Sequence, residues 1–168
     1  ADLKVNWIAG STAERLQMVR SGKADLDCAN TTQTLGRLAN VDFSSLIFID
    51  AGGVMIRADS SFNSIADLDG KKIAVLTDTT TEARLNAIVK KYLVNARVVK
   101  VGDANEAVAM LESGNVDAYA SDKLLLIGAK FADPKAMKLL PDDLSVEPYA
   151  IALPRGDCAI QRCRLATT

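Results

Sequence analysis

Residues 110–121 read MLESGNVDAYAS, and residues 18–29 read MVRSGKADLDCA. Both stretches predict the end of a helix, a Ser-Gly turn, an aspartate and then a strand. A polar residue follows each predicted strand, Asn30 in the first copy and Asp122 in the second. In open α/β sheets, ligands bind beyond the carboxyl ends of the strands. Two similar lobes that face each other would therefore place Asn30 and Asp122 across one cleft.

Helices and strands alternate on both sides of these copies. Ser11 with Glu14, and Thr79 with Glu82, have the spacing of a capping box, so a helix is expected after each pair. The strands are expected at 3–9, 24–29, 72–76, 97–101, 116–121 and 146–153, and further helices at 103–114 and 123–131. The apolar stretch 45–57 is too long for one ordinary strand and fits a crossover. This order is typical of an α/β fold with mostly parallel sheets.

The composition excludes several classes of protein. The chain has 168 residues, of which 49% are hydrophobic and 24% charged, which is an ordinary globular balance. Twenty basic and twenty-one acidic side chains leave a formal charge of −1, so the basic excess of a nucleic-acid-binding protein is missing. Histidine is absent, which excludes Ser-His-Asp and Cys-His catalysis and mixed Cys/His zinc sites.

The three cysteines give no metal-ligand spacing. Cys28 is expected to be a small buried hydrophobe, because it lies in the apolar strand pattern at 24–29. The spacing of Cys158 and Cys163 permits a small disulfide and does not require one.

The first residues lead directly into a predicted strand, without the charged and apolar regions of a signal peptide, so any signal peptide is expected to have been removed. No apolar run approaches the roughly 18 residues that a membrane span needs.

Four groups of motifs together resemble a known family, the amino-acid-binding periplasmic proteins of ABC importers. The motifs are TTQTLGR with VDFS at 31–44, IADLDGKKIAV at 65–75 with TTTE at 79–82, LESGNVDA at 111–118, and Ser121-Asp122. The resemblance covers residues 3 to about 156. Cys28 and the run Asn30-Thr31-Thr32 are most similar to the glutamate/aspartate-binding subgroup.

This resemblance implies a two-lobe periplasmic-binding-protein-like α/β fold with a two-strand hinge. Lobe one would hold residues 1–54 together with 153–168, lobe two would hold 55–148, and the hinges would lie near 53–56 and 149–152. Compared with the family, the first strand of lobe one and the closing helices are missing, so the chain resembles a piece truncated at both ends. Lobe one would then be incomplete, and self-association of the truncated form is expected because unpaired sheet edges recruit other chains.

The resemblance also implies how the ligand's main-chain groups are bound. Arg37 would hold the α-carboxylate, since a planar guanidinium binds a carboxylate bidentately. Thr32 and Thr80 would add hydroxyl donors, and backbone N–H groups at the helix start near Thr79 and Thr80 would help. Asp122 would pair with the α-ammonium group.

A second set of residues would surround the ligand's side chain. Arg15 falls where the glutamate/aspartate binders place an arginine for the side-chain carboxylate, and Thr12 lies near it in sequence. Asn30 stands where that subgroup commonly has serine. Two departures are notable: Asp78 replaces the usual glycine before the Thr-Thr pair, and Ala104 replaces a position that can be histidine.

The residues alone also allow simpler roles for each candidate. Arg37 fits an ordinary surface arginine, and Arg15 fits an ion pair with a nearby acid. The threonines at 79–81 and Asp122 fit helix capping, which is compatible with ligand binding because both use the same N–H groups.

The favoured function is capture of an amino acid similar to glutamate or aspartate in an interlobe cleft, for import. The partners would be that small molecule and a membrane permease of the ABC transporter, in the periplasm, with no nucleic acid, no cofactor, no metal and no enzymatic step. Two alternatives use the same fold. One is a dehydratase similar to cyclohexadienyl dehydratases, with Asp122 or Glu82 as the general acid, and the other is the ligand-sensing input module of a receptor.

Overall fold

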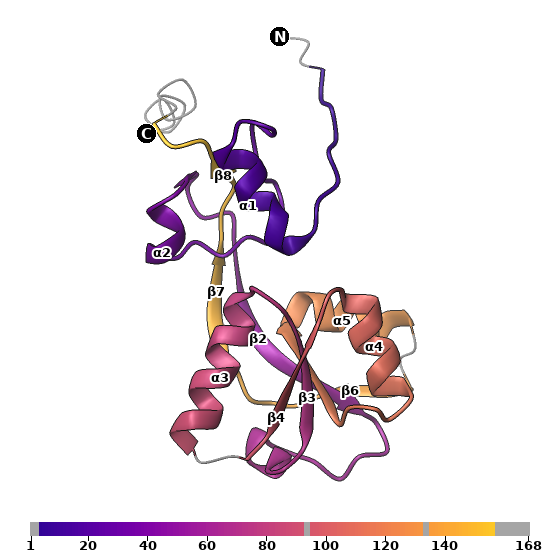
Figure 1. The fold of residues 1–168 in the computed structure, drawn as a ribbon. Helices are drawn as coiled ribbons and strands as arrows, with labels where there is room; N and C mark the ends of the chain where they lie inside the picture. The colour runs from indigo at the N-terminus through magenta and orange to yellow at the C-terminus, as the bar shows by residue number, and fades with distance from the viewer. Residues whose placement is uncertain (1–3, 93–94, 133–134, 157–168) are drawn as a thin grey trace. The chain divides into compact units, whose positions relative to one another are not determined.

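The structure, a computed structural model, describes residues 4–92, 95–132 and 135–156 of the chain (Figure 1). Its elements, in chain order, are α1 Thr12–Arg20, α2 Leu35–Leu38, β1 Asp42–Phe43, β2 Phe48–Arg57, the 3-10 helix η1 Ile65–Leu68, β3 Lys72–Leu76, α3 Thr80–Tyr92, β4 Arg97–Val101, α4 Ala104–Glu112, β5 Ala118–Asp122, α5 Lys123–Ala132, β6 Met137–Leu139, β7 Ser145–Tyr149 and β8 Ala152–Leu153.

The chain divides into two compact units. Unit 1 holds the described residues of 1–48 and 148–168, and unit 2 holds those of 49–147. The predicted lobes, residues 1–54 with 153–168 and residues 55–148, and the hinge positions near 53–56 and 149–152 stay predictions.

Unit 2 is built on a mixed sheet with the strand order β4-β3-β5-β2-β6, and β7 pairs with β2. β3 runs parallel to β4 and to β5, whereas β2 runs antiparallel to β5 and to β6. The expectation of mostly parallel sheets is therefore wrong. Alternation with helices sets the direction only of strands joined by a helical crossover, here β3, β4 and β5 through α3 and α4. β2 precedes the first of these helices, so the alternation does not set its direction.

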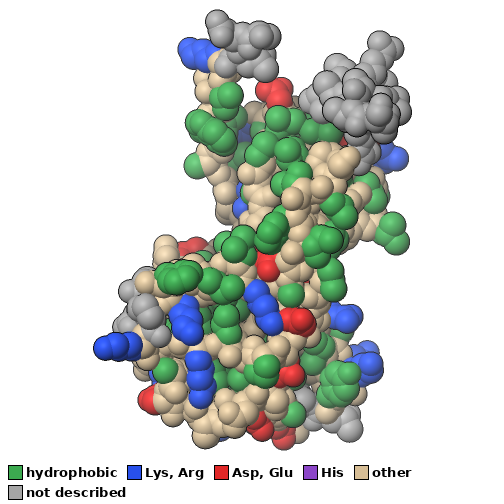
Figure 2. All heavy atoms as spheres, turned by 180° about the vertical axis from the view of Figure 1, so that it is seen from behind, with side chains coloured by type: hydrophobic (Ala, Val, Ile, Leu, Met, Phe, Trp, Pro, Cys, Tyr) green, Lys and Arg blue, Asp and Glu red, His purple; other side chains and the backbone are tan. Residues whose placement is uncertain are grey.

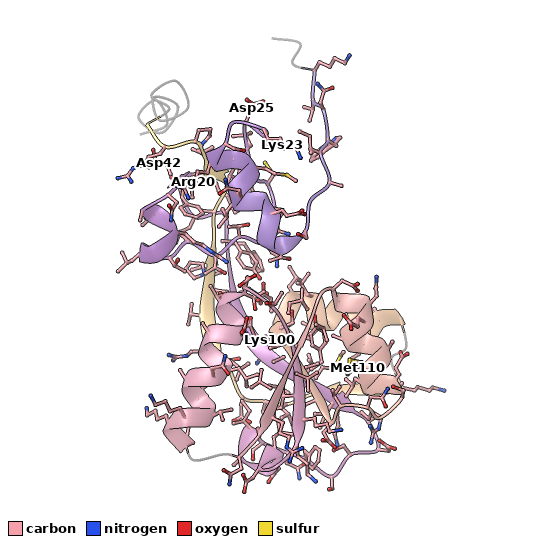
Figure 3. The ribbon with its side chains drawn as sticks, viewed as in Figure 1. Arg20, Lys23, Asp25, Asp42, Lys100 and Met110 are labelled. Carbon is pink, nitrogen blue, oxygen red and sulfur yellow. The ribbon has the colours of Figure 1, made fainter. Side chains whose placement is uncertain are left out.

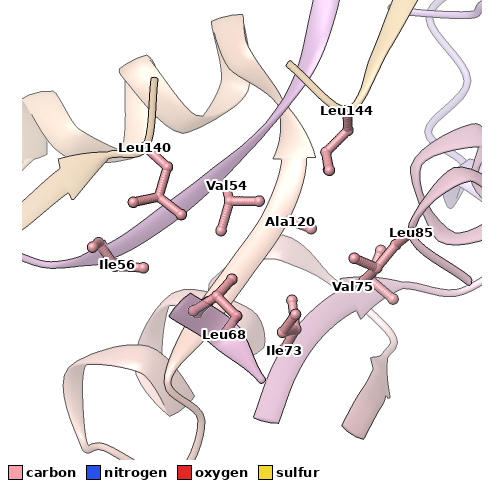
Figure 4. Close-up of a cluster of buried hydrophobic side chains, with 10 residues drawn as sticks. Val54, Ile56, Leu68, Ile73, Val75, Leu85, Ala120, Leu140 and Leu144 are labelled. Carbon is pink, nitrogen blue, oxygen red and sulfur yellow. The ribbon is translucent and has the colours of Figure 1, made fainter. Parts of the chain in front are cut away.

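Two apolar clusters cover the two faces of this sheet. Side chains alternate between the faces along each strand, so Val54 and Ile56 of β2 enter one cluster and Met55 enters the other. The first cluster lies under α3 and η1 (Figure 4); besides Val54 and Ile56, its buried members are Leu68, Ile73, Val75, Leu85, Ala118, Ala120, Leu140 and Leu144. The second contains residues of α4 and α5. The sheet thereby carries the end of β5 and the part of β7 that belongs to unit 2, and α3 packs on it through Leu85.

Unit 1 has a smaller core. Val19 of α1 packs with Val41, Phe43, Ala150 and Ala152, and β1 pairs antiparallel with β8. The capping box predicted for α1 is confirmed: Glu14 Oε2 accepts from the Ser11 backbone N–H at 3.0 Å and from its hydroxyl at 2.7 Å. These bonds lower the pKa of Glu14 below its ordinary value.

Two predicted strands of unit 1 are not formed. Residues 4–9 have no ladder partner within the described chain, and Trp7 is 87% exposed. Residues 24–29 contain only an isolated bridge from Asp27 to Ala152. Alternating apolar residues favour an extended backbone, but a strand requires a neighbour for its N–H and C=O groups. Cys28 is exposed, contrary to the buried position expected for it, because no sheet forms around it. Cys158 and Cys163 lie outside the described residues.

In unit 2 the predicted elements are close to the observed ones. The strands at 72–76 and 97–101 match β3 and β4. Asp103 caps α4 by accepting from the Glu106 N–H at 2.9 Å, and Gly114 ends the turn after α4 with a φ of 74°. The strand expected at 116–121 is observed as β5 at Ala118–Asp122. Asp122 therefore closes a buried strand immediately before α5.

No helix among the described residues has the length and apolar character needed to cross a bilayer. On the face displayed in Figure 2, basic and acidic side chains are interspersed, in keeping with the near-zero net charge.

Candidate functional site

A polar cluster in unit 1 surrounds Arg15 of α1. The Arg15 Nε lies 3.4 Å from Oδ1 of Asp27, whose side chain is only 5% exposed, and a second nitrogen of Arg15 donates to Asn30 Oδ1 at 3.5 Å. Asp27 Oδ2 accepts from the Thr31 hydroxyl at 2.5 Å. The structure therefore brings Arg15 and Asn30 together. Asp27, which the sequence reasoning did not select, balances the charge of Arg15.

Thr12, the other predicted neighbour of Arg15, is the first residue of α1 and is partly exposed. It precedes Arg15 by three residues, so both side chains lie on the same side of the helix.

Arg37 and Thr32 form a second pair within unit 1. The Arg37 guanidinium donates to the Thr32 backbone oxygen at 2.8 Å, and the Arg37 N–H donates to the capping hydroxyl of Thr34 at 3.2 Å. Thr32 is buried and bridges to Tyr149, while the neighbouring Gln33 N–H donates to the Pro148 oxygen at 2.8 Å. The backbone at Thr32 is thus tied to the returning chain, and it holds the Arg37 side chain in turn.

The start of α3, in unit 2, is marked by three consecutive threonines, Thr79 before the helix and Thr80 and Thr81 within it, whose hydroxyl protons all go to acceptors within the chain. The Thr79 hydroxyl donates to the Leu76 oxygen at 2.8 Å, and the Thr80 hydroxyl donates to Glu147 Oε2 at 2.8 Å. The Thr81 hydroxyl donates to Asp122 Oδ1 at 3.3 Å. Since a hydroxyl has one proton, each of these oxygens can meet a further group only as an acceptor.

Two of these contacts were not anticipated from the sequence. Thr81 lies in the threonine run and directs the Asp122 carboxylate. Glu147 lies on β7 and is 1% exposed. The signal that could have revealed Glu147 is its position: in the strand pattern it shares the inward face with Tyr149, where an ionisable side chain needs hydrogen-bond partners.

The loop before α3 is held by a left-handed residue and an ion pair. Asp78 has a φ of 59°, a conformation usually taken by glycine and tolerated by aspartate. Its N–H donates to Glu82 Oε2 at 2.8 Å, and Glu82 Oε1 lies 2.7 Å from the ammonium nitrogen of Lys100 (labelled in Figure 3). The Lys100 contact is the main cause of a lowered pKa of Glu82, and the same pair raises the pKa of Lys100.

These groups give the start of α3 a bipolar character. The first backbone N–H groups of a helix have no helical acceptor and attract anions, which applies here to Thr80 and Thr81. The Asp122 carboxylate, bonded to Thr81, supplies an opposite charge beside them. A small molecule with a carboxylate and an ammonium attached to the same carbon is complementary to this arrangement.

Comparison with solved structures identifies the class to which this fold belongs. A periplasmic binding protein from Brucella ovis, solved with glutathione bound, has a TM-score of 0.87 at 30% identity; the match covers 92% of this chain and 50% of that one. An ancestral arginine-binding protein, solved with arginine, has a TM-score of 0.86 at 28% identity, covering 95% of this chain and 71% of that one. The fold is therefore the α/β periplasmic binding protein fold, of which this chain covers a part.

At the level of sequence, the chain belongs to the NMT1/THI5-like family, whose profile matches residues 1–140. It is 28% identical over 158 residues to the glutamate/aspartate import solute-binding protein of Escherichia coli K12, an alignment that covers 93% of this chain and 52% of that protein. The chain thus spans about half the length of the curated relatives it matches. The resemblance to amino-acid-binding periplasmic proteins of ABC transporters, including glutamate/aspartate binders, is confirmed.

Proposed function

We propose that the chain is the solute-binding component of an amino-acid ABC importer, that it acts in the periplasm with a membrane permease as its partner, and that it binds one amino acid. The observation that carries this proposal is the bipolar start of α3, where N–H groups of Thr80 and Thr81 accompany the Asp122 carboxylate. The relatives described as amino-acid-binding proteins support the same conclusion.

The α-carboxylate of the ligand would be bound by the N–H groups of Thr80 and Thr81 and by Arg37, and the α-ammonium by Asp122. Arg37 suits this role because its guanidinium is already oriented by the Thr32 oxygen, so less freedom is lost on binding. Thr79 would act indirectly, since its hydroxyl caps α3 by accepting from the Glu82 N–H at 3.1 Å.

The ligand's side chain would be met by Arg15, Asn30 and Thr12, and we propose an acidic amino acid as the ligand. The cationic guanidinium of Arg15 and the glutamate/aspartate-binding relatives support this choice. A neutral amide side chain is the second candidate, because the ion pair with Asp27 already balances the charge of Arg15.

Enzymatic dehydration receives no support from the geometry around Glu82. A general acid at neutral pH needs a raised pKa, whereas the contact with Lys100 holds the pKa of Glu82 below its ordinary value. The relatives named above are described as binding proteins, and a binding role without a chemical step fits the same residues.

The test is an NMR titration of the 15N-labelled chain with the common amino acids up to millimolar concentration, a range in which weak binding is still visible. We expect L-glutamate or L-aspartate to shift the amide resonances of Thr80 and Thr81, and Asp122→Asn to abolish the shifts. Glutamine and asparagine distinguish the acid from the amide. If no amino acid moves these two amides, the proposed function is wrong.

A further inference from the structure

Glu147 is a buried carboxylate that the proposed ligand contacts do not include. It lies on β7 with 1% of its surface exposed, and its Oε2 accepts from the Thr80 hydroxyl at 2.8 Å. Its other oxygen, Oε1, accepts from the hydroxyl of Ser145, two residues earlier on the same strand. Both oxygens of the carboxylate are therefore bonded to hydroxyl groups of unit 2.

The backbone of β2 packs directly against this chain of hydrogen bonds. A Cβ atom at Gly52 would stand 2.5 Å from the Ser145 hydroxyl oxygen, so only glycine lets Ser145 take its position. Gly52 is also the register partner of Asp122 in the sheet. The carboxylates of Glu147 and Asp122 are thus fixed to the same part of the sheet, and each accepts from a threonine in the first turn of α3.

The direction of the bond between Thr80 and Glu147 follows from the hydrogen bonds around the carboxyl group. Both oxygens of Glu147 accept from hydroxyl groups, so the single hydroxyl proton of Thr80 is used in its bond to Oε2. The lone pairs of that hydroxyl remain, and they accept from N–H or O–H groups only. Thr80 as a whole is only partly buried.

We propose that Glu147 is a positioning residue that fixes the Thr80 hydroxyl as an acceptor, so that Thr80 binds the cationic ammonium of the ligand and not its carboxylate. The inference rests on the proposed function for its ligand, although the placement of the proton can be measured without one. In this proposal the two parts of Thr80 bind groups of opposite charge on the ligand. The backbone N–H binds the anionic carboxylate, and the side-chain oxygen binds the cationic ammonium.

The consequence is a selection for ligands that carry an ammonium next to their carboxylate. L-Glutamate has this group, whereas glutarate has the same two carboxylates without it. When Glu147 accepts the Thr80 hydroxyl proton, a carboxylate oxygen of the ligand that faces this hydroxyl lies against its lone pairs. No hydrogen bond can then form between the two oxygens. Glutarate should accordingly gain nothing from the Thr80 hydroxyl.

The binding experiment compares L-glutamate with glutarate on the wild-type chain and on Thr80→Val, Thr80→Ser, Glu147→Met, Glu147→Gln and the double variant Thr80→Val/Glu147→Met. We expect Thr80→Val and Glu147→Met each to weaken L-glutamate binding about tenfold, as for one charge-assisted hydrogen bond. Neither should weaken glutarate binding, and the double variant should be no worse than the single ones. Thr80→Ser keeps the hydroxyl and Glu147→Gln keeps a carbonyl acceptor, so both should bind nearly as the wild type does.

Equal losses for L-glutamate and glutarate, or additive losses in the double variant, would show that Glu147 acts only on the fold and would overturn the inference. A second measurement needs no ligand and no variant: the hydroxyl proton of Thr80 should exchange slowly with water and show a nuclear Overhauser effect to the Glu147 side chain. If no amino acid binds but this proton is found, the proposed function fails and the acceptor role of Thr80 stands. If the proton points elsewhere, the inference fails whatever binds.

Discussion

Glu82 and Lys100 join the first turn of α3 to β4 through a contact of 2.7 Å between a carboxylate oxygen and an ammonium nitrogen. The same carboxylate accepts the N–H of Asp78 at 2.8 Å, so one side chain holds both the adjacent strand and the loop that precedes the helix. Its effect on the stability of the fold must therefore depend on pH.

The pKa of Glu82 is lowered in the folded chain, so the carboxylate stabilises the fold above its unfolded pKa, which is near 4.5. This contribution is lost as the pH falls through the lower, folded pKa. We expect Glu82→Gln to reduce the free energy of unfolding at neutral pH and to flatten its decline below about pH 4.5. Urea unfolding over a pH series measures this, with Glu112→Gln on the exposed end of α4 as the control. If the free energy of unfolding of Glu82→Gln declined at acid pH as steeply as that of the wild type, the role of the ion pair with Lys100 would be contradicted.

Asp78 adopts a left-handed backbone conformation with a φ of 59°. Glycine takes this conformation without steric cost, whereas alanine does not and also lacks the short polar side chain of aspartate. We expect Asp78→Ala to be less stable than Asp78→Gly by about 1 kcal/mol, with Asp78→Asn close to the wild type. Thermal unfolding of the three variants is the measurement. Equal melting temperatures for the alanine and glycine variants would show that the left-handed conformation is not populated in solution.

Gly52 and Gly36 form a matched pair for a test of packing. A Cβ at Gly52 would collide with the Ser145 hydroxyl oxygen at 2.5 Å, whereas a Cβ at Gly36 on α2 would meet nothing within 4 Å. We expect Gly52→Ala to cost about 1–3 kcal/mol, as overpacked sites do. Gly36→Ala should be neutral or slightly stabilising, because alanine favours a helix. Denaturant unfolding compares them, and a neutral Gly52→Ala would mean that Ser145 has room to move.

Arg15 and Asp27 should be coupled in stability. Arg15→Met leaves the Asp27 carboxylate, 5% exposed, without its cation, while its bond to the Thr31 hydroxyl remains. We expect a loss of about 1–3 kcal/mol for this variant, of which Asp27→Asn in the same chain restores a part. A double-mutant cycle on the free energies of unfolding measures the coupling. Additive losses would indicate that the two side chains do not interact in solution.

Elements that are determined by their own local sequence could be predicted, whereas elements that depend on contacts with distant segments could not. The strands at 72–76 and 97–101 and the capping of α1 and α4 follow from local patterns, and these predictions are confirmed. Within the described residues, the segments 4–9 and 24–29 carry the same local pattern but form no ladder, apart from the isolated bridge at Asp27, and no local pattern reveals this. The direction of β2 was missed for a related reason, since it depends on which strands become neighbours.

In the candidate site, local sequence patterns likewise do not reveal which partner each hydroxyl proton is donated to. Motif resemblance selected Arg15, Asn30 and the threonine run and assigned Thr80 a donor role towards the ligand, which stays a prediction. The acceptor role that we propose for Thr80 depends on Glu147, which is 67 positions away in sequence and lies 2.8 Å from the Thr80 hydroxyl. A hydroxyl can donate or accept, so the direction of its hydrogen bond depends on the partners that the folded chain places around it and not on the residue type.

The exposure of Trp7 determines what an optical experiment on this chain can report. It is the single tryptophan of the sequence, and it lies in the extended segment 4–9 with 87% of its surface exposed. Its emission should therefore be red-shifted and readily quenched by iodide. A blue shift that grows with protein concentration would report burial of this segment against another chain. Fluorescence from Trp7 thus serves as a sensor of association.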